Sequence, residues 1–304
     1  MIEKFHFGQP TGTSVIVLMF YPRKSMRDIQ TKIADSITPF LSSFWAKANT
    51  YDDVRFAVAR DVDGNVPVWH SPKDNSVPSS QWPDTSAVFL RDTLAHLPIE
   101  KIVGETESRS PFDQMSDLAR SLSVKLAGSH EPIWIHFLYF RDRDLLPDPN
   151  SATYLEDSKR KFLAALDQSP LSRFRYSIHF FSHFDPSAKC LAPSRIATRL
   201  QTAFSDMSYS QYELCDILTP PGTPWEEAVN HSIAHQTSAM TLMKPPEQKT
   251  LATLATLEVH AGSALIANEE IIFNAETNEV RFTKKGAQNL KIGQEIQVRY
   301  VPKK

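Results

Sequence analysis

The fold is decided by residues 14–26, which read SVIVLMFYPRKSM. Residues 15–20 form a continuous apolar run, which is typical of a parallel strand buried on both faces of its sheet. A polar turn follows, and Ser25 is a residue type that begins helices as an N-cap. Beyond it, apolar residues recur at helical spacing up to Pro39, which we expect near the helix end. A buried strand that leads through a polar turn into a helix is how open α/β sheets build ligand sites.

Strand-like and helix-like segments alternate along most of the chain. Residues 54–70 contain two strand-like runs around Asp63-Gly64-Asn65, which predicts an antiparallel hairpin because Gly and Asn tolerate a left-handed backbone. Residues 71–85 are predicted to form a long loop. Further helices are predicted over 87–97, 113–126, 159–166, 194–204 and from Thr223 towards Met240, and further strands over 132–140, 174–184 and 212–218. This order predicts an α/β domain with a mostly parallel sheet.

The pattern changes after Lys244-Pro245-Pro246, a sequence typical of a linker. Beyond it the apolar residues alternate with a period of two, which indicates antiparallel strands. The sequence therefore predicts three regions: an α/β domain over 1–243, a linker over 244–249, and a small C-terminal β module over 250–304.

Composition indicates an ordinary globular protein. Of 304 residues, 41% are apolar, and the formal net charge of −2 creates no field that would draw the chain to nucleic acid or to an anionic membrane. The two cysteines, Cys190 and Cys215, argue against a disulfide framework and against a cysteine-based zinc site, and they fit a reducing cytosol. Residues 1–10 lack the apolar core of a signal peptide. We expect a cytoplasmic protein with no membrane partner.

The opening stretch resembles that of a von Willebrand factor A (vWA) domain, in which the first strand ends in Asp-x-Ser-x-Ser, often followed by Met. In that family the motif holds a divalent metal ion. Here the matching positions are Tyr21, Arg23 and Ser25. The resemblance extends over about residues 10–243 and implies a vWA/Rossmann-like, doubly wound and mostly parallel sheet with one antiparallel edge hairpin.

Two further loops carry metal ligands in vWA domains. Ser110, just before a predicted helix, could stand for the threonine of the second loop, and Asp142 lies within one position of the aspartate of the third. Mg²⁺ prefers octahedral oxygen ligands that include carboxylates. Arg23 and Arg141 would repel a cation at the same sheet edge. The resemblance thus implies a degenerate metal site, for which we expect no metal and no other cofactor.

Arginine and lysine side chains recur in these strand-end loops: Arg23, Lys24, Arg109, Arg141 and Arg143. Helix N-termini at this edge favour anions, so these side chains could pair with an acidic side chain of a partner protein. Alternatively, they pair within the loops with Glu107, Asp142 and Asp144. Intracellular vWA proteins commonly serve as adaptors in large assemblies, including partners of AAA+ ATPases. The resemblance therefore implies a non-catalytic protein–protein interaction subunit.

Two other functions remain open. A vWA-like domain followed by β structure also resembles the layout of Ku-type DNA-end proteins. The C-terminal module carries basic residues near Phe282 and Tyr300, a combination that can bind single-stranded nucleic acid; they are Lys284, Lys285, Lys291, Arg299, Lys303 and Lys304. A divergent hydrolase would instead use Asp142 or Asp144 with a histidine.

Histidine and cysteine patterns add little to these hypotheses. His231 and His235 have the spacing that places two imidazoles on one helix face, where they could bind a transition metal or be a chance pair. His179 and His183 share one face of a predicted strand, but about 13 Å separates such positions. Cys215 follows an apolar residue in a strand-like run, which predicts a buried structural thiol.

Overall fold

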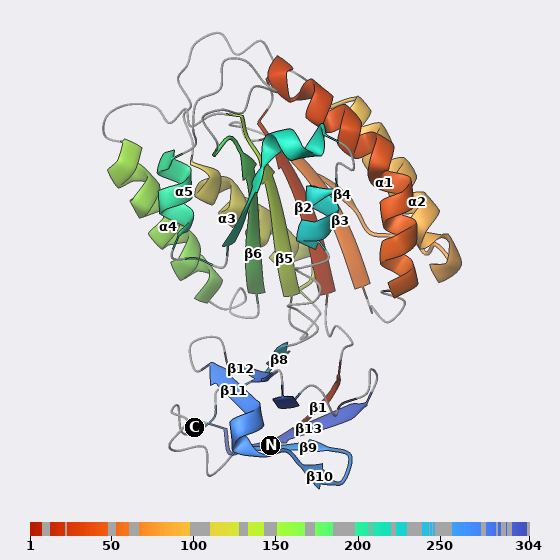
Figure 1. Cartoon of the computed structure of the whole chain (residues 1–304). Coiled ribbons are helices and arrows are strands. Elements are labelled where there is room, and N and C mark those ends of the chain that lie inside the picture. Colours follow the sequence, from red (N-terminus) through yellow and green to blue (C-terminus); the bar gives the residue numbers. More distant parts are fainter. Residues whose placement is uncertain are drawn as a thin grey trace. The chain divides into compact units, whose positions relative to one another are not determined.

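The computed structural model divides the chain into two compact units (Figure 1). The α/β unit contains Thr13–Asn49 and Asp53–Asn230, and the β unit contains Met1–Gly12, Thr50–Asp52 and His231–Lys304. The residues described are 1–7, 13–21, 23–47, 53–60, 67–97, 110–127, 133–142, 151–167, 174–184, 198–205, 207, 209–219, 223–229, 239–242, 244, 246, 257–274, 278–283, 285–286, 290 and 294–302.

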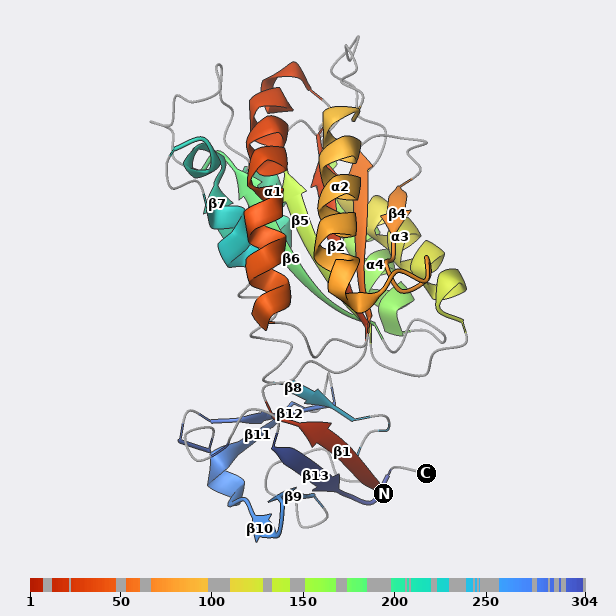
Figure 2. The same ribbon diagram turned by 90° about the vertical axis from the view of Figure 1, so that its right-hand side faces the viewer.

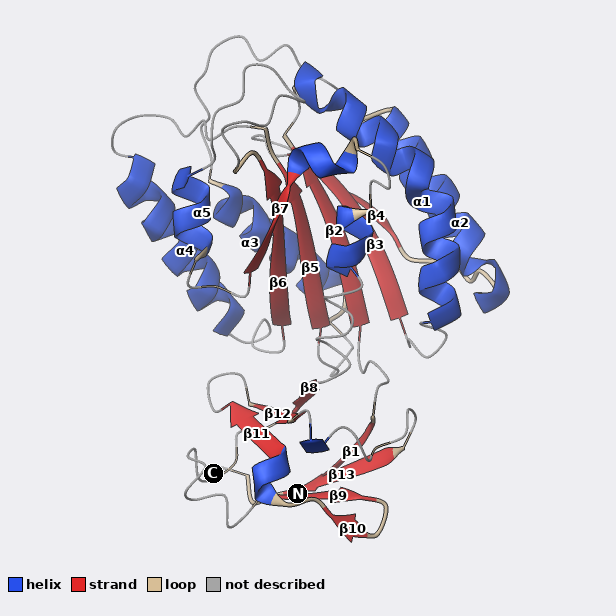
Figure 3. Cartoon of the chain, viewed as in Figure 1, coloured by secondary structure: helices blue, strands red, loops and turns tan. Residues whose placement is uncertain are grey.

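A six-stranded sheet with the order β4-β3-β2-β5-β6-β7 forms the centre of the α/β unit (Figure 3). Its strands are β2 (Thr13–Phe20), β3 (Asp53–Arg60), β4 (Val68–His70), β5 (Ile133–Phe140), β6 (Phe174–Ser182) and β7 (Tyr209–Glu213). All neighbours are parallel except β3 and β4, in which Phe56 pairs antiparallel with His70. The doubly wound, mostly parallel sheet with one antiparallel edge is therefore confirmed; the turn around Gly64 lies outside the described residues.

Helices cover both faces of this sheet (Figures 1 and 2). They are α1 (Arg27–Lys47), α2 (Trp82–Ala95), α3 (Pro111–Lys125), α4 (Ser151–Asp167) and α5 (Thr198–Phe204). Helices α1 and α2 lie on one face, and α3, α4 and α5 lie on the other. Alternate strand residues such as Val15 and Ile135 join the core under α3–α5, while their neighbours are buried on the opposite side. Burial on both faces explains the continuous apolar runs.

Several helix boundaries differ from the prediction. A 3₁₀ helix, η1 (Lys24–Met26), precedes α1, so Ser25 does not cap α1. Pro39 lies inside α1, because the buried side chains of Phe40 and Phe44 continue the helix beyond it. Helix α2 begins within the predicted loop over 71–85.

Further differences concern the second half of the α/β unit and the segment after it. Helix α4 begins at Ser151, well before the predicted residue 159. Strand β7 ends at Glu213, and Cys215 lies in the 3₁₀ helix η4 (Leu214–Ile217) rather than in a strand. Met240 lies in β8 (Ala239–Thr241) instead of at the end of a helix.

The β unit consists of two antiparallel sheets, ordered β1-β13-β9-β10 and β11-β12-β8. Besides β8, its strands are β1 (Ile2–His6), β9 (Glu258–Ala261), β10 (Ala264–Leu265), β11 (Ile271–Asn274), β12 (Glu279–Phe282) and β13 (Glu295–Arg299). Strand β1 pairs with β13 and contributes Phe5 to the core of this unit. The division thus differs from the predicted 1–243 and 250–304, since β1 and β8 both belong to the β unit.

Candidate functional site

The carboxyl ends of β2 and β5 place the predicted site residues side by side. The two strands run in parallel register, with Phe20 opposite Phe140. The Tyr21 N–H donates to the Phe140 carbonyl at 3.0 Å, and the Arg141 N–H donates to the Phe181 carbonyl at 3.0 Å. These bonds extend the sheet one residue beyond the strand ends. Tyr21 and Arg141 are therefore fixed by the backbone before their side chains make any contact.

The phenol ring of Tyr21 is contacted by two guanidinium groups. The Arg141 Cζ lies 4.6 Å from the ring centroid and the Arg23 Cζ lies 5.2 Å from it. Arg141 is 0% exposed, and its Nη1 donates to the Tyr139 hydroxyl at 2.7 Å. Desolvated cation–π contacts of this kind contribute about 2 kcal/mol, and exposed ones about 0.5–1 kcal/mol. The contact of Arg141 therefore belongs to the stronger, desolvated kind. Arg23 is only half-buried, so its contact contributes less.

Ser25 and Asp142 also meet at this edge. The Ser25 Oγ donates to the Asp142 Oδ2 at 2.5 Å, which joins the loop after β2 to the loop after β5. Asp142 is almost fully buried. We call the set Tyr21, Arg23, Ser25, Arg141 and Asp142 the β2–β5 rim.

Ser110 lies at the start of α3, and its described contacts are structural. It caps α3, where its Oγ accepts a hydrogen bond from the Asp113 N–H at 3.4 Å. Its own N–H donates to the Tyr154 hydroxyl of α4 at 3.4 Å. That hydroxyl in turn donates to the Asp113 carboxylate at 2.7 Å. Burial and the carboxylate both raise the pKa of Tyr154. The described hydrogen bonds of Ser110 therefore connect α3 with α4 and do not include the β2–β5 rim.

The donor set of the β2–β5 rim does not fit the divalent metal that a vWA domain implies. Its oxygen ligands would be the Ser25 hydroxyl and the Asp142 carboxylate, and the hydroxyl already donates its proton to that carboxylate. Mg²⁺ prefers six oxygen ligands, and the guanidinium groups of Arg23 and Arg141 add like charge. Among the described cationic residues here, Arg23 and Lys24 reach solvent. Arg109, Arg143 and Asp144 lie outside the described residues.

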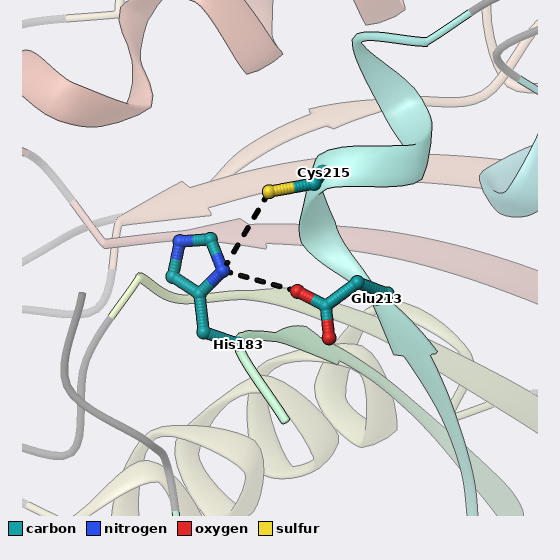
Figure 4. A group of neighbouring side chains, drawn as sticks. All are labelled: His183, Glu213 and Cys215. Atoms are coloured by element: carbon teal, nitrogen blue, oxygen red, sulfur yellow. Dashed lines mark hydrogen bonds and ion pairs between the residues drawn. The ribbon is translucent and has the colours of Figure 1, made fainter. Parts of the chain in front are cut away.

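A second cluster, which the sequence analysis missed, lies where β6 and β7 end (Figure 4). His183 Nδ1 is 3.0 Å from Glu213 Oε1 and 3.8 Å from Cys215 Sγ. The second oxygen of Glu213 accepts a hydrogen bond from the Phe184 N–H at 2.9 Å. We call His183, Glu213 and Cys215 the β6–β7 rim. The sequence does place these three residues at or just after the ends of two strands, but nothing in it shows that the two strands are neighbours.

Cys215 is disulfide-bonded. The prediction of a buried structural thiol at Cys215 is therefore wrong. Cys190 is the only other cysteine of the sequence and lies outside the described residues. The arrangement is also unsuited to nucleophilic catalysis. A catalytic histidine binds its nucleophile and its orienting carboxylate through different ring nitrogens, whereas Glu213 and Cys215 both face Nδ1 of His183.

No family model matches the chain, and no curated protein matches it. Solved structures do match. Proximal thread matrix protein 1 from the mussel byssus shares 8% identity, with 78% of this chain and 48% of that chain covered and a TM-score of 0.40. The pilus adhesin SpaC from Lactobacillus rhamnosus GG shares 10%, with 98% and 42% covered and a TM-score of 0.46.

Manganese-loaded TRAP protein from Plasmodium vivax shares 9% identity, with 77% of this chain and 76% of that chain covered and a TM-score of 0.43. The chain spans less than half the length of the mussel protein and of SpaC. Similarity at this level concerns the fold and not the ligand or partner. Among the described residues, no helix is long and apolar enough to cross a membrane.

Proposed function

We propose that this chain is a non-catalytic protein–protein interaction subunit that binds a partner through the loops of the β2–β5 rim without a bridging metal. The observation that carries the proposal is the pair of guanidinium groups on the Tyr21 ring, at the position where the vWA resemblance implies a metal-binding carboxylate. A fixed cation there can attract an acidic side chain of a partner directly.

The burial of the rim assigns different tasks to its cations. Arg141 is inaccessible and holds Tyr21 and Tyr139 in place. Arg23 and the exposed Lys24 are the groups that a partner's carboxylate would meet. This proposal refines the hypothesis that the cationic side chains of these loops could pair with an acidic side chain of a partner. An intracellular assembly containing an AAA+ ATPase is the partner class that the vWA resemblance suggests.

The two alternatives have weaker support. In the β unit, Arg281 pairs with Glu279 at 2.7 Å and Lys285 pairs with Glu270 at 3.3 Å, which reduces the charge available to nucleic acid. Lys284, Lys291, Lys303 and Lys304 lie outside the described residues. For a hydrolase, Asp142 would have to activate water, yet it accepts a short hydrogen bond from Ser25.

The proposal is tested by affinity purification of the tagged chain from native lysate, with parallel Mg²⁺ and EDTA arms read by mass spectrometry. The expected result is a stoichiometric partner that is retained in EDTA and lost with Arg23→Glu. Arg160→Glu is the matched control, because Arg160 is an exposed arginine of α4 that pairs with Asp157. A partner lost in EDTA, or lost equally with both variants, would contradict the proposal. Retention of nucleic acid that declines steeply with salt would favour the Ku-like alternative.

A further inference from the structure

The β6–β7 rim has the spacing of a transition-metal site. In a tetrahedral zinc site with metal–ligand distances of about 2.0–2.3 Å, the ligand atoms lie about 3.3 Å (N to O) and about 3.6 Å (N to S) apart. The observed separations from His183 Nδ1 are 3.0 Å to oxygen and 3.8 Å to sulfur. The three ligand atoms all lie within 4.8 Å of one another. A cation would therefore need little movement of the side chains.

The surroundings hold this donor set in place. His183 is fully buried and directly follows β6, which fixes its position. The next residue, Phe184, donates its N–H to the Glu213 carboxylate and so holds that side chain beside the imidazole. The side chain of Glu213 is 20% exposed, which leaves a path for an ion from solvent. Imidazole and thiolate are ligands of zinc and its neighbours in the first transition row, whereas Mg²⁺ and Ca²⁺ require oxygen ligands.

We propose that His183 Nδ1, Glu213 Oε1 and Cys215 Sγ form a zinc-class site that opens when the disulfide of Cys215 is reduced. A dithiol reductant transfers two electrons and two protons, so the S–S bond breaks, two thiols form, and the reductant becomes a disulfide. The thiol of Cys215 then loses its proton on binding the metal. His183 ligates through unprotonated Nδ1 with its proton on Nε2, and water can complete the coordination.

The sulfur of Cys215 cannot form the disulfide and bind a metal ion at the same time. Metal binding therefore favours the reduced chain, and the disulfide prevents metal binding. Zinc at 100 times its dissociation constant shifts the disulfide equilibrium about 100-fold towards the dithiol. For a two-electron couple this corresponds to a rise of about 59 mV in the reduction potential. In a reducing cytosol the site would be open to metal, and in an oxidising compartment it would be closed.

The test uses the full chain and Co²⁺ as a spectroscopic probe, followed by competition with Zn²⁺. After reduction and anaerobic removal of the reductant, we expect one Co²⁺ per chain and the near-ultraviolet charge-transfer band of a thiolate ligand. The oxidised chain should show neither. The absence of the thiolate band in the reduced chain, or equal binding by the oxidised chain, would overturn the proposal.

Two cysteine variants form a matched pair, because each removes one of the two cysteines of the sequence. Cys190→Ser should bind Co²⁺ without any reductant. Cys215→Ser should lose the thiolate band and weaken binding by roughly 100-fold or more, since the loss of a direct ligand exceeds the about 10–100-fold effect of outer contacts. Equal affinity of the two variants would overturn the proposal.

Two more variants locate the site. Glu213→Gln should weaken binding by at least about tenfold while the thiolate band persists. His231→Ala should leave binding unchanged, because His231 and His235 form the other histidine pair that the sequence offers. If His231→Ala abolishes binding and Cys215→Ser does not, the metal binds at that pair and the proposal is wrong. Thermal unfolding of each variant shows whether it is folded.

Discussion

The two rims lie on adjacent strand pairs of one sheet and interact with positive charge in opposite ways. At the β2–β5 rim, guanidinium groups contact the Tyr21 ring, and the one carboxylate, Asp142, accepts a hydrogen bond from Ser25. At the β6–β7 rim, a histidine, a carboxylate and a sulfur face a common point. The comparison teaches that a parallel sheet supplies equivalent positions at its strand ends. The residues at those positions decide whether the positive charge belongs to an arginine side chain or could come from a bound metal ion.

The largest expected effect comes from a change that should destroy both rims together. Ile135 lies on β5 in the buried core beneath α3–α5. Ile135→Asp places an unpaired carboxylate there, and its cost of several kcal/mol is comparable with the about 5–15 kcal/mol by which domains are stable. We expect loss of the cooperative thermal transition of the α/β unit and of partner and Co²⁺ binding alike. A folded variant that retains either kind of binding would show that the two rims do not depend on this core.

The next largest effect should separate the two arginines of the β2–β5 rim. Arg141→Met keeps the apolar stem but removes the bond to Tyr139 and the contact with Tyr21, at a cost of about 2–3 kcal/mol. Arg23→Met should cost less than about 1 kcal/mol, because Arg23 is half-buried. Urea unfolding measures both. Equal costs would mean that the different burial of the two side chains does not determine their roles.

A smaller effect is expected from the hydrogen bond that joins the loops of the β2–β5 rim. Ser25→Ala leaves the buried Asp142 without that donor and should cost about 1–2 kcal/mol in free energy of unfolding. Ser80→Ala, at an exposed position of the 3₁₀ helix η2 (Ser79–Gln81), is the control and should stay within about 0.5 kcal/mol. If Ser25→Ala is also neutral, the short contact contributes nothing to joining the two strands.

The smallest expected effect is a change in how stability depends on pH. It concerns a histidine at the β4 edge of the sheet, the edge opposite β7. His70 of β4 stacks on Phe89, and burial lowers the pKa of its imidazole. Below about pH 6.5 this imidazole therefore binds a proton more readily in the unfolded chain than in the folded chain. As a result, the free energy of unfolding falls as the pH decreases through that value. His70→Phe should reduce the loss of melting temperature between about pH 7.5 and 5.5. An unchanged loss would assign the acid sensitivity to other groups, including those of the β6–β7 rim.

The sequence predicted the sheet well because burial on both faces leaves a visible pattern. The uninterrupted apolar runs in β2 and β5 exist because helices cover both sides, and the contact of Ser25 with Asp142 follows from parallel neighbours that end at the same level. The complete burial of Arg141 was not predictable, because an arginine in a loop carries no signal of what lies over it.

The β6–β7 rim and the pairing of β1 depend on contacts between distant residues. Cys215 lies in η4, directly after the short edge strand β7, and no periodicity identifies the neighbour of that strand. Neither the disulfide of Cys215 nor its contact with His183 could therefore be deduced. Strand β1 reads as an ordinary N-terminal segment, and its partner β13 lies almost a whole chain length away. Local patterns report that a residue is buried but not against which neighbour.

The pairing of β1 with β13 also determines when the protein can finish folding during its synthesis. Ile2 must wait for Arg299, and translation at about 5–20 residues per second makes that delay roughly 15–60 s. Throughout this interval β1 has no β13 to pair with, while the strands and helices of the α/β unit emerge in sequence. We therefore expect chaperones to bind the incomplete β unit during this interval. Slower translation should lengthen the time for which they stay bound.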